Sequence, residues 1–167
     1  EGAGQPDLYF DYGVPGDIPV VGDWTGNGVD TVGVVRGNQW LLRTRNSPGQ
    51  PDISFTFGQP GDIPVVGDWD GDGRDGIGVV RGTTWLLRNT PTAGPPDHTF
   101  DFGDADGIPV VGDWDGDGVS SPGRFSNGTW QVINRLTSSG PDFTFEYGQA
   151  GDEPLVWRRL AEPVVGS

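Results

Sequence analysis

Hydrophobic and polar residues alternate along the chain in short runs, which is the period of half-buried β-strands. Residues 18–21, 32–36 and 39–43 form three such runs, rich in Val, Ile, Leu and Trp and separated by turns that contain Gly, Asp and Asn. No stretch of useful length has the 3.6-residue period of an amphipathic helix. The pattern therefore predicts an all-β chain of short strands.

The same runs return at a fixed spacing. Gly-Asp-Trp begins at residues 22, 67 and 112, so the period is 45 residues. Each unit reads as an Ile-Pro-Val-Val strand, an acidic loop, a second strand, a tight turn, a Trp-containing third strand and a fourth strand that ends in glycine. In the last unit the tight turn is Asn127-Gly128, which is a strong hairpin signal. A constant period of this size predicts a repeat architecture.

Four antiparallel strands in about 45 residues are the size of one β-propeller blade. We interpret residues 1–167 as a single repeat domain, with a half unit at 1–21, repeats phased on residues 22, 67 and 112, and a terminal half unit at 141–167. Strands expected at 8–12 and 154–157 would complete one shared blade and protect the open edges. A β-trefoil also has three units of four strands and is the alternative, although it needs no extra half unit.

The composition narrows the classes of partner. The formal net charge is −14, with 24 acidic and 10 basic residues, and all of the basic residues are arginine. Nucleic acids and anionic membranes bind basic surfaces, so we expect neither as a partner. No run is long enough for membrane insertion. Cysteine is absent, so neither disulfides nor thiol chemistry is expected.

The most acidic loop, residues 67–75, contains Asp68, Asp70, Asp72 and Asp75 among three glycines. Carboxylates this close together repel one another unless a cation lies between them. Asp at relative positions one, three and five, followed by Gly at six, is the spacing of the first half of a calcium-binding EF-hand loop. Related loops occur at 22–30 and 112–120. The alternative is that they are ordinary Asp-Gly turns capped by their own side chains.

These three loops resemble those of the FG-GAP and VCBS repeats, which are found in the propellers of integrin α-subunits and in secreted bacterial proteins. The resemblance implies a β-propeller in which the loop between a blade's first two strands binds Ca²⁺. Side chains at positions one, three and five, the backbone carbonyl at seven and a carboxylate at nine would be the ligands. Positions one, three, five and seven are here Asp23, Thr25, Asn27 and Val29; Asp68, Asp70, Asp72 and Arg74; and Asp113, Asp115, Asp117 and Val119.

The chain departs from the family at the end of the loop. Position nine is Thr31, Gly76 or Ser121, while an acid lies one place earlier at Asp30 and Asp75. Either the loop closes one residue sooner, with Asp30 and Asp75 as the last ligands, or water takes that place. We expect the middle loop to bind calcium most tightly because the number of charged ligands tunes affinity.

Other candidate residues favour packing over catalysis. Trp40, Trp85 and Trp130 lie within predicted strands and are expected in the core. His98 is the sole histidine and takes the place of apolar residues in the other copies, so no pair of nucleophile and base is available. A further set, Trp24, Trp69 and Trp114, is expected to support the loops, with exposed platforms for glycans as the alternative.

The expected function is therefore a non-catalytic, calcium-binding β-propeller that acts as an extracellular binding or adhesion module. Weak oxygen cages of this kind fill where calcium is millimolar, which favours a secreted or cell-surface location. The partner would be an extracellular protein or glycan ligand. Two alternatives remain: a self-assembling structural protein that binds copies of itself in a multi-chain ring or filament, and a lectin-like glycan-binding domain.

Overall fold

The computed structural model describes residues 7–156. Within that range every regular element is a β-strand, and no helix there is long and apolar enough to cross a membrane. The all-β prediction is confirmed. The strands are β1 (Ile18–Gly22), β2 (Thr31–Arg36), β3 (Gln39–Leu42), β4 (Ile53–Thr56), β5 (Ile63–Gly67), β6 (Gly76–Arg81), β7 (Thr84–Arg88), β8 (His98–Asp101), β9 (Ile108–Gly112), β10 (Ser121–Ser126), β11 (Thr129–Val132) and β12 (Phe143–Glu146).

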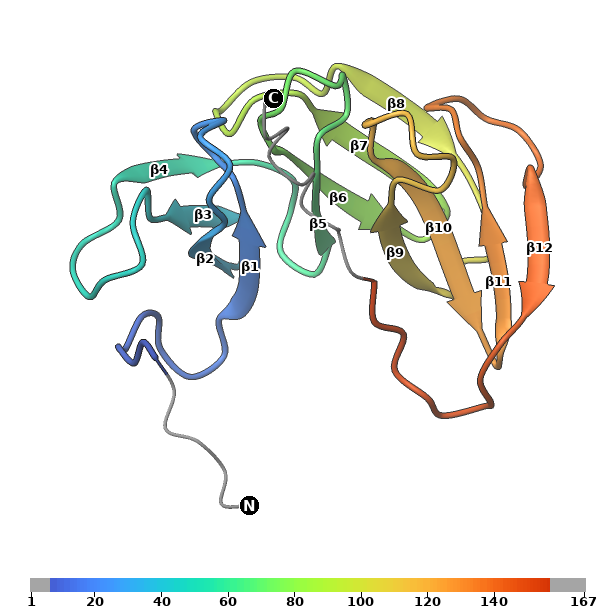
Figure 1. Cartoon of the computed structure of the whole chain (residues 1–167), viewed down its shortest axis with the longest axis horizontal. Coiled ribbons are helices and arrows are strands. Elements are labelled where there is room, and N and C mark those ends of the chain that lie inside the picture. The colour runs from blue at the N-terminus through green and yellow to red at the C-terminus, as the bar shows by residue number, and fades with distance from the viewer. Residues whose placement is uncertain (1–6, 157–167) are drawn as a thin grey trace, which may run out of the picture.

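The strands form three four-stranded antiparallel sheets, β1 to β4, β5 to β8 and β9 to β12, in which neighbours in sequence are neighbours in space. We call them the first, second and third sheets. Their registers agree, because a valine of the first strand faces a glycine of the second strand in each sheet. Figure 1 shows the sheets following one another in an arc, with β1, β5 and β9 toward its middle.

Tight turns with positive φ join the second and third strands. Gly37 (φ 64°) and Gly82 (φ 58°) supply this conformation in the first and second sheets. In the third sheet Asn127 (φ 51°) and Gly128 (φ 92°) both adopt it, as a type I′ hairpin turn requires. The Asn-Gly hairpin predicted from the sequence is confirmed.

The hydrophobic core lies between consecutive sheets. Trp40 and Leu42 of the first sheet pack with Ile77 of the second sheet. Trp85 of the second sheet packs in turn with Ile133, which directly follows β11 of the third sheet. The prediction that Trp40, Trp85 and Trp130 belong to the core is confirmed, since all three are buried. The cluster around Trp130 has no fourth sheet against it within residues 7–156.

Glycines allow the first strands of neighbouring sheets to approach closely. A Cβ atom at Gly22 would lie 2.8 Å from Cγ1 of Val66, and one at Gly67 would lie 2.7 Å from Cβ of Ser120. Real Cβ atoms do not come this near to other atoms, so a side chain at either position would push the sheets apart. The Gly-Asp-Trp sequence therefore marks a junction between sheets as well as a loop.

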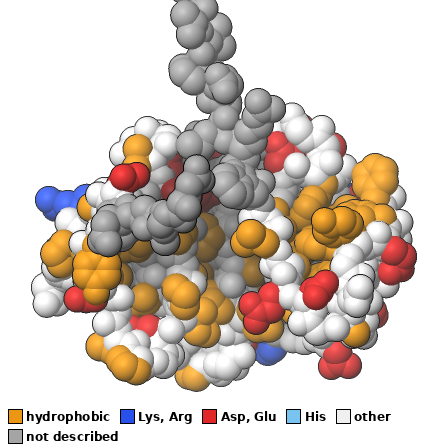
Figure 2. Space-filling view, turned by 60° about the horizontal axis from the view of Figure 1, so that its bottom comes forward, with side chains coloured by type: hydrophobic (Ala, Val, Ile, Leu, Met, Phe, Trp, Pro, Cys, Tyr) orange, Lys and Arg blue, Asp and Glu red, His pale blue; other side chains and the backbone are white. Residues whose placement is uncertain are grey.

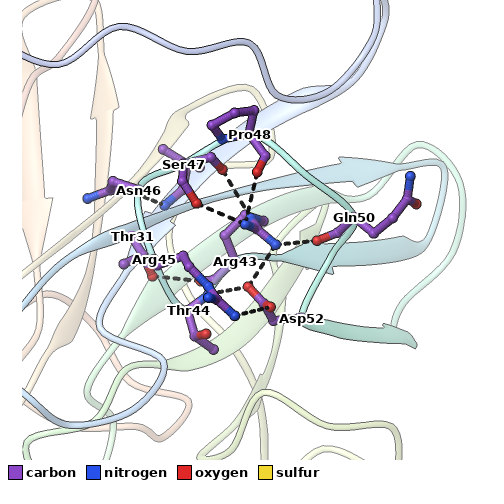
Figure 3. A network of polar contacts seen from close by, with 10 residues as sticks. Thr31, Arg43, Thr44, Arg45, Asn46, Ser47, Pro48, Gln50 and Asp52 are labelled. Atoms are coloured by element: carbon purple, nitrogen blue, oxygen red, sulfur yellow. Dashed lines mark hydrogen bonds and ion pairs between the residues drawn. The ribbon is translucent and has the colours of Figure 1, made fainter.

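A buried arginine fixes the connection that leads from β3 to β4. Figure 3 shows the guanidinium of Arg43 at the centre of this linker, where it donates hydrogen bonds to the carbonyl oxygens of Pro48 and Gln50. The same guanidinium lies 2.9 Å from a carboxylate oxygen of Asp52, and the Arg43 carbonyl accepts a hydrogen bond from the Thr31 hydroxyl at 2.7 Å. The polar linker is thus folded back onto its own sheet.

The predicted strands at the two ends of the chain are wrong. Residues 8–12 and 154–156 are not in strands, and Trp157 lies outside the described residues. In the other copies the Phe-containing strand pairs with the third strand of its own sheet, as Phe55 does with Trp40. No third strand precedes residue 8 within the described range, so that segment lacks the hydrogen-bonding neighbour that a strand requires.

Candidate metal centres

Each acidic loop connects the first two strands of its sheet. Residues 23–30 join β1 to β2, residues 68–75 join β5 to β6, and residues 113–120 join β9 to β10. Because the three sheets share one register, the three loops lie at equivalent ends of their sheets.

In the middle loop the backbone curls around the side chain of Asp68. Its Oδ1 accepts hydrogen bonds from the backbone N–H groups of Gly71 at 2.8 Å and Asp72 at 3.2 Å, and its Oδ2 accepts one from Gly73 at 2.8 Å. Gly71 (φ 74°) and Gly73 (φ 82°) have the positive φ that this curl needs, which glycine adopts without strain. The Arg74 N–H donates to Oδ1 of Asp72 at 2.8 Å.

This curl brings carboxylates together in two of the three loops. Asp68, Asp70 and Asp72 each offer an oxygen atom within 4.8 Å of the others, and Asp113, Asp115 and Asp117 form an equivalent group. Three carboxylates at this separation are a hard oxygen donor set that suits a metal cation, and they repel one another without one. The sequence prediction that positions one, three and five meet is confirmed for these two loops.

Asn89 extends the middle cluster beyond its loop. Its side-chain amide nitrogen donates a hydrogen bond to Oδ2 of Asp70 at 2.9 Å. Asn89 directly follows β7, so a residue far along the sequence contacts the middle acid. Nothing in the spacing of the loop residues pointed to Asn89.

The first loop has the same backbone but fewer charges. Asp23 accepts hydrogen bonds from Gly26 at 2.8 Å and Gly28 at 2.6 Å, and the Val29 N–H donates to the side chain of Asn27 at 2.9 Å. Burial raises the pKa of Asp23, but hydrogen bonds from the loop backbone outweigh it and leave the pKa lowered. With Thr25 and Asn27 at positions three and five, this loop offers neutral oxygens where the others offer carboxylates.

The residue at loop position eight contacts the preceding loop. Oδ2 of Asp75 accepts a hydrogen bond from the Asp23 N–H at 2.8 Å, and the Asp75 N–H donates to the Asp23 carbonyl at 2.9 Å. Ser120 repeats this pair on Asp68, with its hydroxyl oxygen 3.0 Å from the Asp68 nitrogen and its own N–H 2.6 Å from the Asp68 carbonyl. We call this double contact the junction clamp.

The junction clamp defines a role that the sequence prediction missed. The sequence left two alternatives, Asp75 as the last metal ligand of its own loop or water in that place, and in the structure Oδ2 of Asp75 accepts a hydrogen bond from the backbone of the loop before it. Asp30, the equivalent residue of the first loop, is exposed. One feature of the sequence pointed to this role: position eight is Asp75 in the second loop and Ser120 in the third. Both side chains can accept a hydrogen bond, but only that of aspartate is charged.

The tryptophans that follow the first aspartates support the loops, as predicted. Trp24 and Trp69 are buried, and Trp114 is half-buried. The indole N–H of Trp69 donates to the Ile77 carbonyl at 3.2 Å, and that of Trp114 donates to the Ser121 carbonyl at 2.9 Å. Trp24 and Trp69 are therefore not the exposed platforms of the glycan-binding alternative. His98 is half-buried within β8.

The first strands surround a hollow of about 460 Å³. Val21, Val66 and Val111, which are equivalent residues of the three sheets, line it together with Val156. The position-eight residues of all three loops also line it. The metal loops and the junction clamps thus lie around one central space.

Comparison with known proteins identifies no relative. No family model, no curated protein and no solved structure matches this chain. The functional interpretation therefore depends on the chemistry of the loops and on the way in which the sheets meet.

Proposed function

We propose that this chain is a calcium-binding β-propeller of the FG-GAP and VCBS type, and that it acts as a non-catalytic binding or adhesion module outside the cell. The observation that carries the proposal is the convergence of three carboxylates in each of two equivalent loops. Their backbone is already curled by hydrogen bonds to the first aspartate. A divalent cation would neutralise the carboxylates and hold the connection between two strands.

The packing of the sheets favours a propeller. Three separate four-stranded meanders follow one another, and β5 lies between β1 and β9. The first strands surround a common hollow, as the innermost strands of blades do around a propeller axis. A β-trefoil would instead combine strands from different units in one barrel.

The donor set favours calcium over magnesium. Calcium accepts six to eight oxygen ligands in flexible geometry, whereas magnesium requires near-octahedral geometry and keeps its waters. The middle loop supplies Asp68, Asp70 and Asp72, and the carbonyl of Arg74 follows. We expect the middle loop to bind calcium more tightly than the third loop, because Asp68 is buried and Asp113 is exposed. We also expect it to bind calcium more tightly than the first loop, because it carries more carboxylates.

The surface favours a role in binding. With a net charge of −14, the chain would repel nucleic acids and anionic lipids. Loops that fill at millimolar calcium would be occupied outside the cell. A protein or glycan ligand is thus the partner class that we propose, and a glycan array would separate a lectin from a module that binds proteins.

Thermal unfolding with and without calcium tests the metal assignment. Binding to the folded state alone stabilises it by about 2.7 kcal/mol when free calcium is a hundred times its dissociation constant. We expect the melting temperature to fall in EDTA and to recover with excess calcium, and to recover less with magnesium. The double variant Asp70→Asn, Asp72→Asn should lose most of this response.

The matched control is Asp106→Asn, which removes an exposed carboxylate outside the acidic loops. Its response to calcium should equal that of the unmodified chain. Identical melting of the unmodified chain in EDTA and in calcium would refute the metal assignment.

A further inference from the structure

We propose that this chain associates head to tail with a second copy of itself, so that the third sheet of one copy docks against the first sheet of the next. The inference goes beyond the calcium-binding function. It rests on the two junctions inside the chain, where the second sheet docks on the first and the third sheet docks on the second. The outward surfaces of the first and third sheets carry the two halves of that same junction.

The outward surface of the third sheet, which we call the trailing face, exposes residues that are buried in the second sheet. Tyr147 is 76% exposed, whereas the equivalent Phe102 is 2% exposed. Phe145 is 45% exposed, whereas the equivalent Phe100 is 4% exposed. Phe100 is covered because it packs in the cluster that includes Ile133, from beyond β11. The aromatic residues of the trailing face thus lack the cover that a next sheet gives to Phe100, and within residues 7–156 Val156 packs against the Trp130 cluster of the same sheet.

The outward surface of the first sheet, which we call the leading face, shows the complementary pattern. Val21 is 55% exposed, whereas the equivalent Val66 and Val111 are half-buried. Asp30 is exposed, whereas the equivalent Asp75 is buried because it clamps the preceding loop. Figure 2 shows hydrophobic side chains gathered in several places on one side of the molecule, with acidic side chains between them.

The hydrogen-bonding groups of the two faces also match. Within residues 7–156 the Asp30 carboxylate has no hydrogen-bond partner, and neither does the Asp113 N–H. At the internal junctions these same groups form the clamps between Asp75 and Asp23 and between Ser120 and Asp68. Docking would place the carboxylate of Asp30 on the Asp113 N–H of the other copy.

A glycine would also allow the first strands of the two copies to approach closely. A Cβ atom at Gly22 would meet Val66 of the next sheet. At Gly112, the equivalent glycine of the third sheet, the three atoms nearest to such a Cβ all belong to Trp114 of its own loop. Gly112 therefore leaves room for Val21 of a second copy, where Gly22 receives Val66.

A second copy fits better than closure of one chain on itself. The first and third sheets lie at opposite ends of the arc in Figure 1. A second copy brings a leading face to each trailing face without distorting the two existing junctions.

The ends of the chain make room for this docking. Residues 8–11 and 143–146 are equivalent in the 45-residue period, as are 18–21 and 153–156, so only one of each pair fits at a junction between copies. β12 and β1 are hydrogen-bonded within their sheets, whereas residues 8–12 and 153–156 are in no strand. The two segments that are not in strands would therefore give way.

A contact between two different faces has a definite consequence for assembly. Each copy keeps one free face, so association continues until a ring closes, or without limit as a filament. This behaviour differs from that of a symmetric dimer, in which both copies use the same face.

Complementation between two variants tests the proposal. Val21→Arg blocks the leading face, and Tyr147→Arg blocks the trailing face. By light scattering after size exclusion, we expect the unmodified chain to exceed the mass of one chain as its concentration rises, and each variant alone to keep that single mass. An equimolar mixture should form a complex of two chains, because each variant retains one intact face.

Two further variants control for side effects. Ile63→Arg places the same charge on a residue that is 48% exposed in a first strand but outside both faces, and it should assemble like the unmodified chain. Asp30→Ser should also assemble, because Ser120 forms the same clamp, whereas Asp30→Arg should not. Circular dichroism checks that each variant is folded.

Two results would overturn the proposal. One is a single-chain mass for the unmodified protein at every concentration up to about 1 mM, in calcium and in EDTA alike. The other is a mixture of the two blocked variants that stays at the mass of one chain, since a head-to-tail contact requires them to complement each other.

Discussion

At the scale of single residues, different positions of an acidic loop have different roles, although they lie close together in the sequence. The aspartates at positions one, three and five gather their oxygens at one point. The residue at position eight instead clamps the backbone of the loop before it, and this task is performed by Asp75 in one junction and by Ser120 in the other. An acidic residue in such a loop can therefore hold the neighbouring loop in place.

The junction clamp predicts an asymmetric response to mutation. Asp75→Ala leaves the Asp23 N–H without its acceptor at a buried junction, which should lower the free energy of unfolding by about 1–3 kcal/mol. Asp75→Ser should retain most of the stability, because Ser120 supplies a hydroxyl at the equivalent place. Urea denaturation in EDTA measures both without a contribution from metal.

Asp106→Ala is the matched control for this experiment, since Asp106 is exposed and such substitutions usually change stability by no more than about 0.5 kcal/mol. Equal stabilities of Asp75→Ala and Asp106→Ala would contradict the role assigned to the clamp.

At the scale of elements, the turn before a first strand is anchored to the second strand of the same sheet. Arg81, at the end of β6, donates two hydrogen bonds of 2.7 Å to Asp62. Arg36 binds Asp17 in the same way, at 2.8 and 2.9 Å. In the third sheet the equivalent residue of β10 is Ser126, so this anchor is absent there. The anchors fix how each chain segment enters its sheet.

The Asp62 anchor predicts a loss of stability in acid. Burial raises the pKa of Asp62, but hydrogen bonds from Arg81 and the Gln59 N–H outweigh it, so the pKa is lowered in the folded state. A lowered folded-state pKa gives stability above the unfolded value of about 3.9, and this stability is lost as the pH falls through the folded value. Urea denaturation from pH 7 to pH 2.5 in EDTA should show this loss.

Arg81→Gln should have a smaller acid-dependent loss than the unmodified chain, because it removes a hydrogen-bonded cation from Asp62. Arg74→Gln, which changes an exposed arginine that takes part in no ion pair within residues 7–156, is the control. An Arg81→Gln curve parallel to that of the unmodified chain would refute the anchor.

Much of the secondary structure could be predicted from the sequence, because each strand carries its own alternation and each turn its own glycine. The tight turn at Asn127 and the core positions of Trp40 and Trp85 follow from such local signals. The contacts between units could not be predicted in this way. Asp75 and Asp23 are 52 residues apart in the sequence. The fact that both are aspartates does not indicate which backbone groups they will contact.

The errors at the ends have the same cause. Residues 8–12 carry the same pattern as β4, but a pattern gives only the tendency to form a strand, and the neighbouring strand has to be supplied by the fold. In β4 that neighbour is β3, through pairs such as Trp40 with Phe55. Pairing is a tertiary property that the local sequence does not contain.

At the scale of the whole molecule, loops and junctions form one system around a central hollow. Each clamp fixes the first aspartate of a loop, and that aspartate organises the metal cluster. A cation at Asp68 would thus stabilise both its own loop and the contact with the third sheet. The proposed docking of a second copy extends the same arrangement to Asp113, whose loop lacks a clamp within the described residues.

A crystal structure from protein kept in millimolar calcium, with anomalous scattering recorded, tests the central claim most directly. We predict anomalous peaks in the middle and third loops, at 2.3–2.6 Å from oxygens of Asp68, Asp70 and Asp72 and of their counterparts in the third loop. The middle loop should have the highest occupancy. The absence of a peak from both loops, with their carboxylates turned apart into solvent, would contradict the account.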